Sequence, residues 1–199
     1  MNDIIAHDPE DKQLINRILR GDNRAFEVII KNTEKLVAKI VFKLIPVAED
    51  RKDIAQDVYM KVYHNLQGFK FQSKLSTWIA QITYNTCLSW IEKKKPLLSA
   101  NIHEDNFEGA NAENNRSDFS NDSEIRLSQK ELALILRKEI DNLPAMYQML
   151  ITLFHQESMT YEELSQITGL PSGTVKSYLF RARKTLKENL LSKYKKEAL

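Results

Sequence analysis

Apolar residues recur every three or four positions over the first 95 residues, and this spacing predicts amphipathic helices rather than strands. Gly21 and Pro46 interrupt the pattern, as residues that end helices do. We expect Asn23 to cap the second helix and Asp50 or a neighbour to begin the third. Residues 1–95 are therefore predicted to form a first domain of four helices: about 11–20, from the Asn23 cap to Pro46, about 50–68, and about 75–95.

The same spacing returns in residues 125–199, which we interpret as a second domain of four helices. A long, leucine-rich helix is expected over 124–142, and Pro144 stands where the next helix begins. Thr160-Tyr161-Glu162-Glu163 has the sequence of a capping box, in which the first and last side chains bond each other's backbone amides. Gly169 and Pro171 then predict a tight turn, and we expect Ser172 to cap the last helix.

Between the two periodic blocks, residues 96–124 show no apolar period and are rich in Asn, Asp, Glu and Ser. Such a composition is typical of a flexible linker. The segment carries seven acidic residues against one basic residue, Arg116. Fully extended at ~3.3 Å per residue, it would span about 90 Å. The predicted fold class is therefore all-α, with two small helical domains joined by a flexible acidic linker.

The amino-acid composition limits the classes of fold and function that this chain can have. Only five Gly and five Pro occur in 199 residues, which favours long helices over a fold with many tight turns. The single cysteine, Cys87, excludes an internal disulfide and indicates a reducing compartment. The four His are far apart, so we expect no metal site and no cofactor. The sequence shows neither a signal peptide nor an apolar run long enough for a membrane span, which predicts a cytoplasmic protein.

Residues 160–186 have the pattern of a helix-turn-helix. Val175, Leu179, Ala182 and Leu186 are spaced four, three and four residues apart and are expected to face the core. Residues 171–196 contain eight Lys and Arg against Glu188 alone, the charge expected for a polyanion partner. In DNA-binding proteins the second helix of this motif enters the major groove. The alternative is a helical hairpin with a basic surface. The expected outer face holds Thr174, Lys176, Ser177, Tyr178, Arg181, Lys184 and Lys187.

The first domain combines aromatic and basic residues between positions 66 and 95. Stacking surfaces and cations are what a single-stranded nucleic acid requires. Residues such as Phe69, Trp78 and Trp90 more often belong to a core, and Lys93–Lys95 is most simply interpreted as a basic helix end. The third helix displays polar residues that indicate either an ordinary solvated face or a docking surface.

Several short motifs follow one another in a fixed order. They are Gly21-Asp22-Asn23-Arg24-Ala25-Phe26, Asp53-Ile54-Ala55-Gln56-Asp57-Val58-Tyr59, Phe69 with Ser76-Thr77-Trp78-Ile79 and Ile82-Thr83-Tyr84-Asn85, Leu143-Pro144, Thr160-Tyr161-Glu162-Glu163-Leu164-Ser165, and Gly173-Thr174-Val175-Lys176-Ser177 with Arg181-Ala182-Arg183. Together they resemble the bacterial extracytoplasmic-function sigma factors, two-domain specificity subunits of RNA polymerase. The resemblance covers nearly the whole chain except the linker and the extreme termini.

The resemblance implies an alternative sigma factor that binds core RNA polymerase, directs it to particular promoters and helps to melt them, without catalysis of its own. Polymerase binding would fall to Asp53, Gln56, Asp57 and Lys61. The melted −10 element would contact Phe69, Lys70, Phe71, Lys74, Thr77, Trp78 and Asn85. The −35 duplex would contact Ser172, Thr174, Lys176, Ser177, Tyr178, Arg181, Arg183 and Lys184. The family also implies an anti-sigma regulator, often a membrane-bound one.

Three residues depart from the family pattern. Tyr84 and Ser89 stand where a basic residue and Asp are common, and Tyr178 replaces the usual Arg of the recognition helix. The last change removes a possible bidentate contact to guanine, so the −35 sequence is left open.

Two other functions compete with this interpretation. An operator-binding regulator would explain residues 125–199 but would leave the Phe69–Asn85 motif unused. An enzyme acting on nucleic acid would need a carboxylate or His cluster, and the sequence suggests none.

Overall fold

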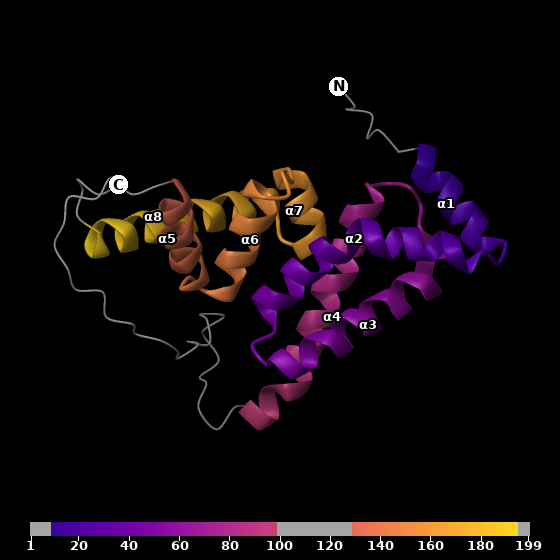
Figure 1. The fold of residues 1–199 in the computed structure, drawn as a ribbon, viewed down its shortest axis with the longest axis horizontal. Coiled ribbons are helices and arrows are strands. Elements are labelled where there is room, and N and C mark those ends of the chain that lie inside the picture. The colour runs from indigo at the N-terminus through magenta and orange to yellow at the C-terminus, as the bar shows by residue number, and fades with distance from the viewer. Residues whose placement is uncertain (1–8, 99–128, 195–199) are drawn as a thin grey trace.

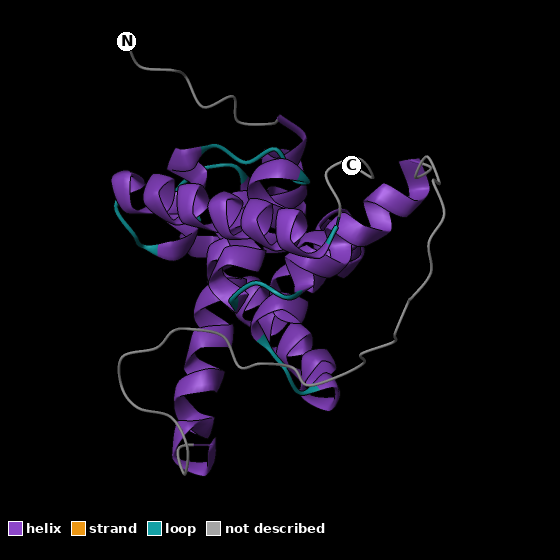
Figure 2. Cartoon of the chain, turned by 90° about the vertical axis from the view of Figure 1, so that its left-hand side faces the viewer, coloured by secondary structure: helices purple, strands orange, loops and turns teal. Residues whose placement is uncertain are grey.

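The computed structural model describes residues 9–98 and 129–194, and the regular elements within these ranges are helices (Figures 1 and 2). The first range contains α1 (Pro9–Leu19), α2 (Asn23–Leu44), α3 (Ala48–Asn65), a 3-10 turn (Leu66–Gly68) and α4 (Leu75–Leu98). The second contains α5 (Gln129–Asp141), α6 (Ala145–His155), α7 (Tyr161–Thr168) and α8 (Ser172–Lys193). The prediction of an all-α fold is confirmed.

The second helix is capped by Asp22, not by Asn23 as expected. The Asp22 carboxylate accepts hydrogen bonds from the amides of Arg24 (3.1 Å) and Ala25 (3.3 Å), and Asn23 is the first helical residue. Arg17 of α1 donates two bonds to the same carboxylate, at 2.7 and 3.0 Å. This pairing draws Asp22 into the cap, so the turn at Gly21 (φ +93°) is fixed from both sides.

The four helices of the first domain pack around α2. Its buried side, with Ile29, Val37 and Ile40 almost fully enclosed, contacts α1, α3 and α4. After α2 ends, Arg51 donates hydrogen bonds to the carbonyl oxygens of Ile45 (2.8 Å) and Pro46 (3.2 Å). These bonds hold the short connection to α3, which begins at Ala48, two residues before the predicted Asp50.

The linker prediction falls largely outside the described residues. α4 continues to Leu98, so three residues assigned to the linker extend the helix. Residues 99–124 of the expected linker, and the expected start of the following helix at 124, lie outside the ranges that the structure describes. The described part of that helix, α5, begins at Gln129.

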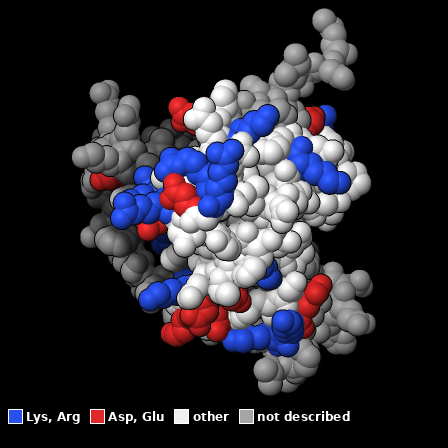
Figure 3. All heavy atoms as spheres, turned by 90° about the vertical axis from the view of Figure 1, so that its right-hand side faces the viewer, with Lys and Arg blue, Asp and Glu red and all other residues white. Residues whose placement is uncertain are grey.

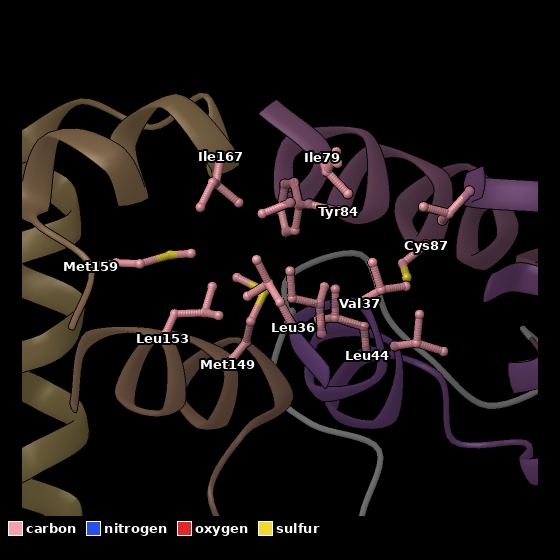
Figure 4. Close-up of a cluster of buried hydrophobic side chains, with 14 of the residues drawn as sticks. Leu36, Val37, Leu44, Ile79, Tyr84, Cys87, Met149, Leu153, Met159 and Ile167 are labelled. Carbon is pink, nitrogen blue, oxygen red and sulfur yellow. The ribbon is translucent and has the colours of Figure 1, made fainter. Parts of the chain in front are cut away.

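The two domains share part of their apolar core. α2 packs against α6, and α4 packs against α7. Figure 4 shows Leu36 and Tyr84 of the first domain facing Met149, Leu153 and Ile167 of the second. Tyr84 is 4% exposed and Met149 is 1% exposed, so this contact excludes water. Two ion pairs, Lys39–Glu157 and Lys43–Asp141, lie at its border.

Among the described helices, none combines the length and apolar character that a membrane span requires.

Candidate nucleic-acid interface

The turn between α7 and α8 has the local structure that the sequence predicts. The Thr160 hydroxyl accepts from the Glu163 amide (3.1 Å), and the Glu163 carboxylate accepts from the Thr160 amide (2.8 Å). Gly169 ends α7 in a left-handed conformation (φ +71°), which glycine adopts without strain. Leu164, Ile167, Val175 and Leu179 are buried at 0–1% exposure, so the two helices pack together as a helix-turn-helix.

The start of α8 differs from the prediction. Pro171, not Ser172, is the cap residue, and no side chain accepts a hydrogen bond there. The Pro171 carbonyl instead accepts from the amides of Thr174 (2.8 Å) and Val175 (3.1 Å). Ser172 is the first helical residue, so its hydroxyl is not used by a cap.

The outer face of α8 is polar and basic. Lys176, Ser177, Arg181, Arg183 and Lys184 are exposed, and Ser172 and Thr174 are half-buried. Phe180, which was absent from the predicted outer face, lies on this same face with 68% of its surface exposed. The signal was present in the spacing, because Phe180 is out of phase with the buried series Val175, Leu179 and Ala182.

Tyr178 does not lie on the exposed face of α8, and its predicted place there is wrong. Its half-buried ring packs against the edge of the Tyr147 ring, with centroids 5.9 Å apart. It also approaches the first domain: burial, with Tyr178 nearby, raises the pKa of the Tyr84 hydroxyl. Two positions along a helix rotate a side chain by about 200°, so Tyr178 and Lys176 point to opposite flanks of α8.

Three aromatic rings come together where the loop before α4 meets the first turn of that helix. Phe69 is 7% exposed, and its ring centroid lies 4.8 Å from that of Phe71 and 5.0 Å from that of Trp78. Phe71 adopts a left-handed backbone conformation (φ +55°), unusual for a bulky residue. Phe69 therefore belongs to the core, while Phe71 and Trp78 are half-exposed.

The other residues that were predicted to contact the −10 element are partly buried in the interior and partly exposed. Lys70, Lys74 and Asn85 are exposed, whereas Thr77 is 1% exposed. Asn85 stands two helical turns after Trp78 and so on the same side of α4. The accessible surface thus consists of Lys70, Phe71, Lys74, Trp78 and Asn85.

This surface contacts the helix-turn-helix. Lys74 Nζ lies 2.9 Å from Glu163 Oε1, and the Thr77 hydroxyl donates to the same oxygen at 3.4 Å. Burial opposes ionisation of Glu163, but the Thr160 amide and the Lys74 ammonium outweigh it and hold the pKa of the Glu163 carboxyl below its usual value. Glu163 is therefore charged at neutral pH and pairs with a cation of the opposite domain.

The polar face of α3 is exposed as expected. Asp53, Gln56 and Asp57 lie at helical spacing on one side of α3, and Lys61 donates to the Thr86 hydroxyl of α4 (3.1 Å). Gln56 borders a mainly apolar hollow of about 360 Å³, whose other lining residues are Asn23, Phe26, Tyr59, Met60, Tyr63 and His64. The end of the molecule that carries α1, α2 and α3 shows a broad uncharged area between charged groups (Figure 3).

Within residues 9–98 and 129–194, no three His, Cys, Asp or Glu side chains converge into a set that would hold a metal ion. Cys87 is fully buried on α4, where burial raises the pKa of its thiol to about 12.

Two family models match the chain. The model of sigma-70 region 2 matches residues 29–96, and that of sigma-70 region 4 matches residues 133–186. The chain is 32% identical over 180 residues to the ECF RNA polymerase sigma-E factor of Escherichia coli (strain K12), covering 88% of this chain and 92% of that protein. It is 29% identical over 185 residues to the RNA polymerase sigma-H factor of Pseudomonas aeruginosa, covering 91% and 94%.

Two solved structures share the fold. CnrH in complex with the cytosolic domain of CnrY gives a TM-score of 0.62 at 18% identity, covering 93% of this chain and 99% of that one. The sigma factor RpoE of Bartonella quintana, in complex with the anti-sigma factor NepR, gives 0.60 at 22% identity, covering 85% and 98%.

Proposed function

Because this chain belongs to the ECF-type sigma factors of the sigma-70 family, it binds core RNA polymerase and directs it to promoters, and we propose how its surfaces divide that task. Residues 1–95 bind polymerase and the −10 element, residues 125–199 bind the −35 duplex, and residues 96–124 link them. The observation that carries this division is the pairing, in one chain, of a basic helix-turn-helix with an aromatic and basic loop.

The second domain binds duplex DNA through α8. The first turns of the helix reach base edges, through Ser172, Thr174 and Ser177, while Lys176, Arg181, Arg183 and Lys184 contact phosphates. Phe180, exposed beside Ser177 and Arg181, adds an apolar group suited to a thymine methyl. Tyr178 lies on the flank near Tyr147 and Tyr84, so it reaches DNA only when the domains have separated.

The first domain binds the melted strand and the polymerase. Phe71, Trp78 and Asn85 offer ring and amide surfaces for an unstacked base, with Lys70 and Lys74 for its phosphates. Phe69 and Thr77, buried beneath, shape this surface rather than touch the base. Asp53, Gln56 and Asp57 of α3 form the polymerase-docking face, and Lys61 is held at its edge by Thr86.

The two DNA-binding surfaces must move apart for this function. Lys74 of the −10 surface contacts α7, the helix next to α8, so the outer face of α8 lies about two helix diameters from it, some 20–24 Å. DNA elements one to two turns apart require roughly 35–70 Å. A linker that spans up to about 90 Å permits this separation. The described arrangement is therefore a closed form that binds at most one element at a time.

We assign an anti-sigma factor as a further partner, since the sigma factor RpoE, which has the same fold, forms a complex with the anti-sigma factor NepR. We place the protein in the cytoplasm, where polymerase and DNA are found, and propose that it acts without catalysis of its own.

In vitro transcription tests the proposal. Core RNA polymerase is incubated with fragmented genomic DNA of the source organism, with and without this protein. We expect transcripts that depend on the protein and share upstream elements. Sequence-specific duplex binding without such transcripts would instead establish the operator-binding regulator.

A further inference from the structure

One flank of α8 is lined by aromatic rings from α6 and α7. The rings of Tyr161 and Phe154 are in contact, with their planes tilted by 40° and their centroids 5.0 Å apart, and Phe154 contacts the edge of the His155 ring at 5.0 Å. The rings come from the end of α6 and the start of α7, which lie beside α8 (Figure 1). Tyr161 and Phe154 are half-buried and His155 is exposed, so the row of rings reaches the protein surface.

Two cations of α8 lie over these rings. Lys176 Nζ is 5.2 Å from the centroid of Tyr161, and the Arg183 guanidinium carbon is 5.1 Å from that of Phe154. Arg183 Nε also donates a hydrogen bond to His155 Nε2 at 3.4 Å. Each cation therefore has an aromatic partner, and the guanidinium has a second contact that fixes its orientation.

Lys176 and Arg183 are seven residues apart, which places them on the same flank of α8 and about 10.5 Å apart along its axis. This flank faces α7 at Lys176 and the end of α6 at Arg183. When the second helix of a helix-turn-helix lies in the major groove, the first helix crosses the sugar-phosphate backbone. The two cations therefore stand beside the backbone rather than over the bases.

Long cationic side chains lose rotamer freedom when they bind a phosphate, and this loss weakens binding. Aromatic rings that already hold such side chains in place reduce this loss of rotamer freedom. We propose that Phe154, Tyr161 and His155 are positioning residues, which hold Lys176 and Arg183 ready for the phosphates of one DNA strand beside the recognition helix. This inference rests on the proposal that α8 binds duplex DNA. It adds Phe154, Tyr161 and His155 to the residues on which the affinity for DNA depends.

The test compares three variants of the full chain, each assembled with core RNA polymerase: Phe154→Leu, Arg183→Ala and the double variant. Binding to a promoter fragment found by the transcription assay is measured over a range of salt concentrations. We expect Phe154→Leu to weaken binding about two- to fivefold, the effect of an exposed cation–π contact. Arg183→Ala is expected to lower the salt slope by about 0.9, one phosphate contact.

The double variant separates positioning from a structural role. If Phe154 acts through Arg183, the double variant binds no more weakly than Arg183→Ala alone. Phe154→Leu then lowers the affinity for a promoter with altered bases by the same factor as for the original promoter. Phe154→Tyr, which keeps a ring, restores wild-type binding. Additive losses, or no loss for Phe154→Leu in a variant that melts at the wild-type temperature, would overturn the proposal.

Phe42→Leu serves as the matched control. Phe42 makes the same kind of contact in the first domain, with the Arg51 guanidinium carbon 4.6 Å from its ring centroid, but lies outside both candidate DNA surfaces. We expect its DNA binding to be unchanged. If the wild-type complex itself fails to bind any promoter fragment, the proposed function fails, and this inference with it.

Discussion

Lys74 and Glu163 form an ion pair of 2.9 Å between the loop before α4 and the first turn of α7. Each residue also has a second assignment: Lys74 belongs to the proposed −10 surface, and Glu163 completes the capping box of α7. The pair joins the two candidate DNA-binding domains at the point where one would meet a single strand. Its strength therefore contributes directly to the balance between the closed form and the separated domains.

Replacing Lys74 with Glu is expected to favour separation. The change puts two carboxylates together at the interface, but the Lys74 side chain is 57% exposed, so solvent screens the effect to about 1 kcal/mol, or roughly fivefold in the ratio of open to closed chains. The measurement is the labelling rate of a cysteine introduced by Met149→Cys, a site buried between the domains, in a Cys87→Ala background.

Lys70→Glu is the control, because it makes the same charge change at an exposed position of the same loop. Its labelling rate is expected to match the parent. Glu163→Gln offers an independent check, since Gln also serves in a capping box while the ion pair is lost. Equal labelling rates in all three variants would show that the pair does not hold the domains together.

The double replacement Asp53→Ala and Gln56→Ala is expected to weaken binding to core RNA polymerase at least tenfold. Both side chains are exposed on α3, and Ala favours a helix, so the melting temperature is expected to stay within about 2 °C of wild type. Affinity is measured with a fluorescent derivative of the full chain. Lys52→Ala, on the adjoining face of α3, is the matched control; an equal loss there would contradict the docking assignment.

Phe180→Ala is expected to reduce promoter affinity about tenfold, because an apolar contact to a base would be lost. The ring is 68% exposed, so the fold loses little packing. Binding to a duplex without the promoter sequence is expected to remain the same, as is the salt slope. A uniform loss on every duplex, measured by fluorescence anisotropy, would show instead that Phe180 supports the fold of α8.

Cys87 is expected to resist thiol reagents in the folded protein at pH 8 and to react rapidly after unfolding in denaturant. It is fully buried, and burial raises the pKa of its thiol from 9.0 to about 12. Because folding favours the protonated thiol, the unfolded chain releases this proton first, and stability falls as pH rises above about 9. Denaturation curves between pH 8 and pH 11 test the sign, since Cys87→Ala removes this part of the dependence.

The helices were predictable from the sequence because their determinants are local. The apolar period, Gly21, the capping box at Thr160 and Gly169 all act within a few residues. The predicted cap at Asn23 was wrong because Asp22 and Asn23 are both good caps, and Asp22 is selected by its pairing with Arg17 of α1. The predicted cap at Ser172 was wrong because Pro171 takes the cap position and its carbonyl accepts the first amides of α8.

The contact between the domains was not predictable. Helical spacing shows that Leu36, Tyr84 and Ile167 face an apolar environment, but it does not show which helix provides it. The exposed and buried flanks of α8 were partly predictable, since the angle between successive residues separates Tyr178 from Lys176. The packing of Tyr178 on Tyr147 and its approach to Tyr84 could be recognised only in the structure.

The core shared between the domains lowers the apparent affinity of the free chain for any ligand that requires the domains to be apart. A ligand that requires separated domains binds only the open fraction, so its apparent dissociation constant rises by the inverse of that fraction. If one chain in a hundred is open, a promoter or polymerase surface is bound a hundredfold more weakly than by the open form. Variants that loosen the contact of Leu36 and Tyr84 with Met149 and Ile167 would therefore increase apparent affinity without touching any ligand, and polymerase and promoter would reinforce each other's binding through the same opening.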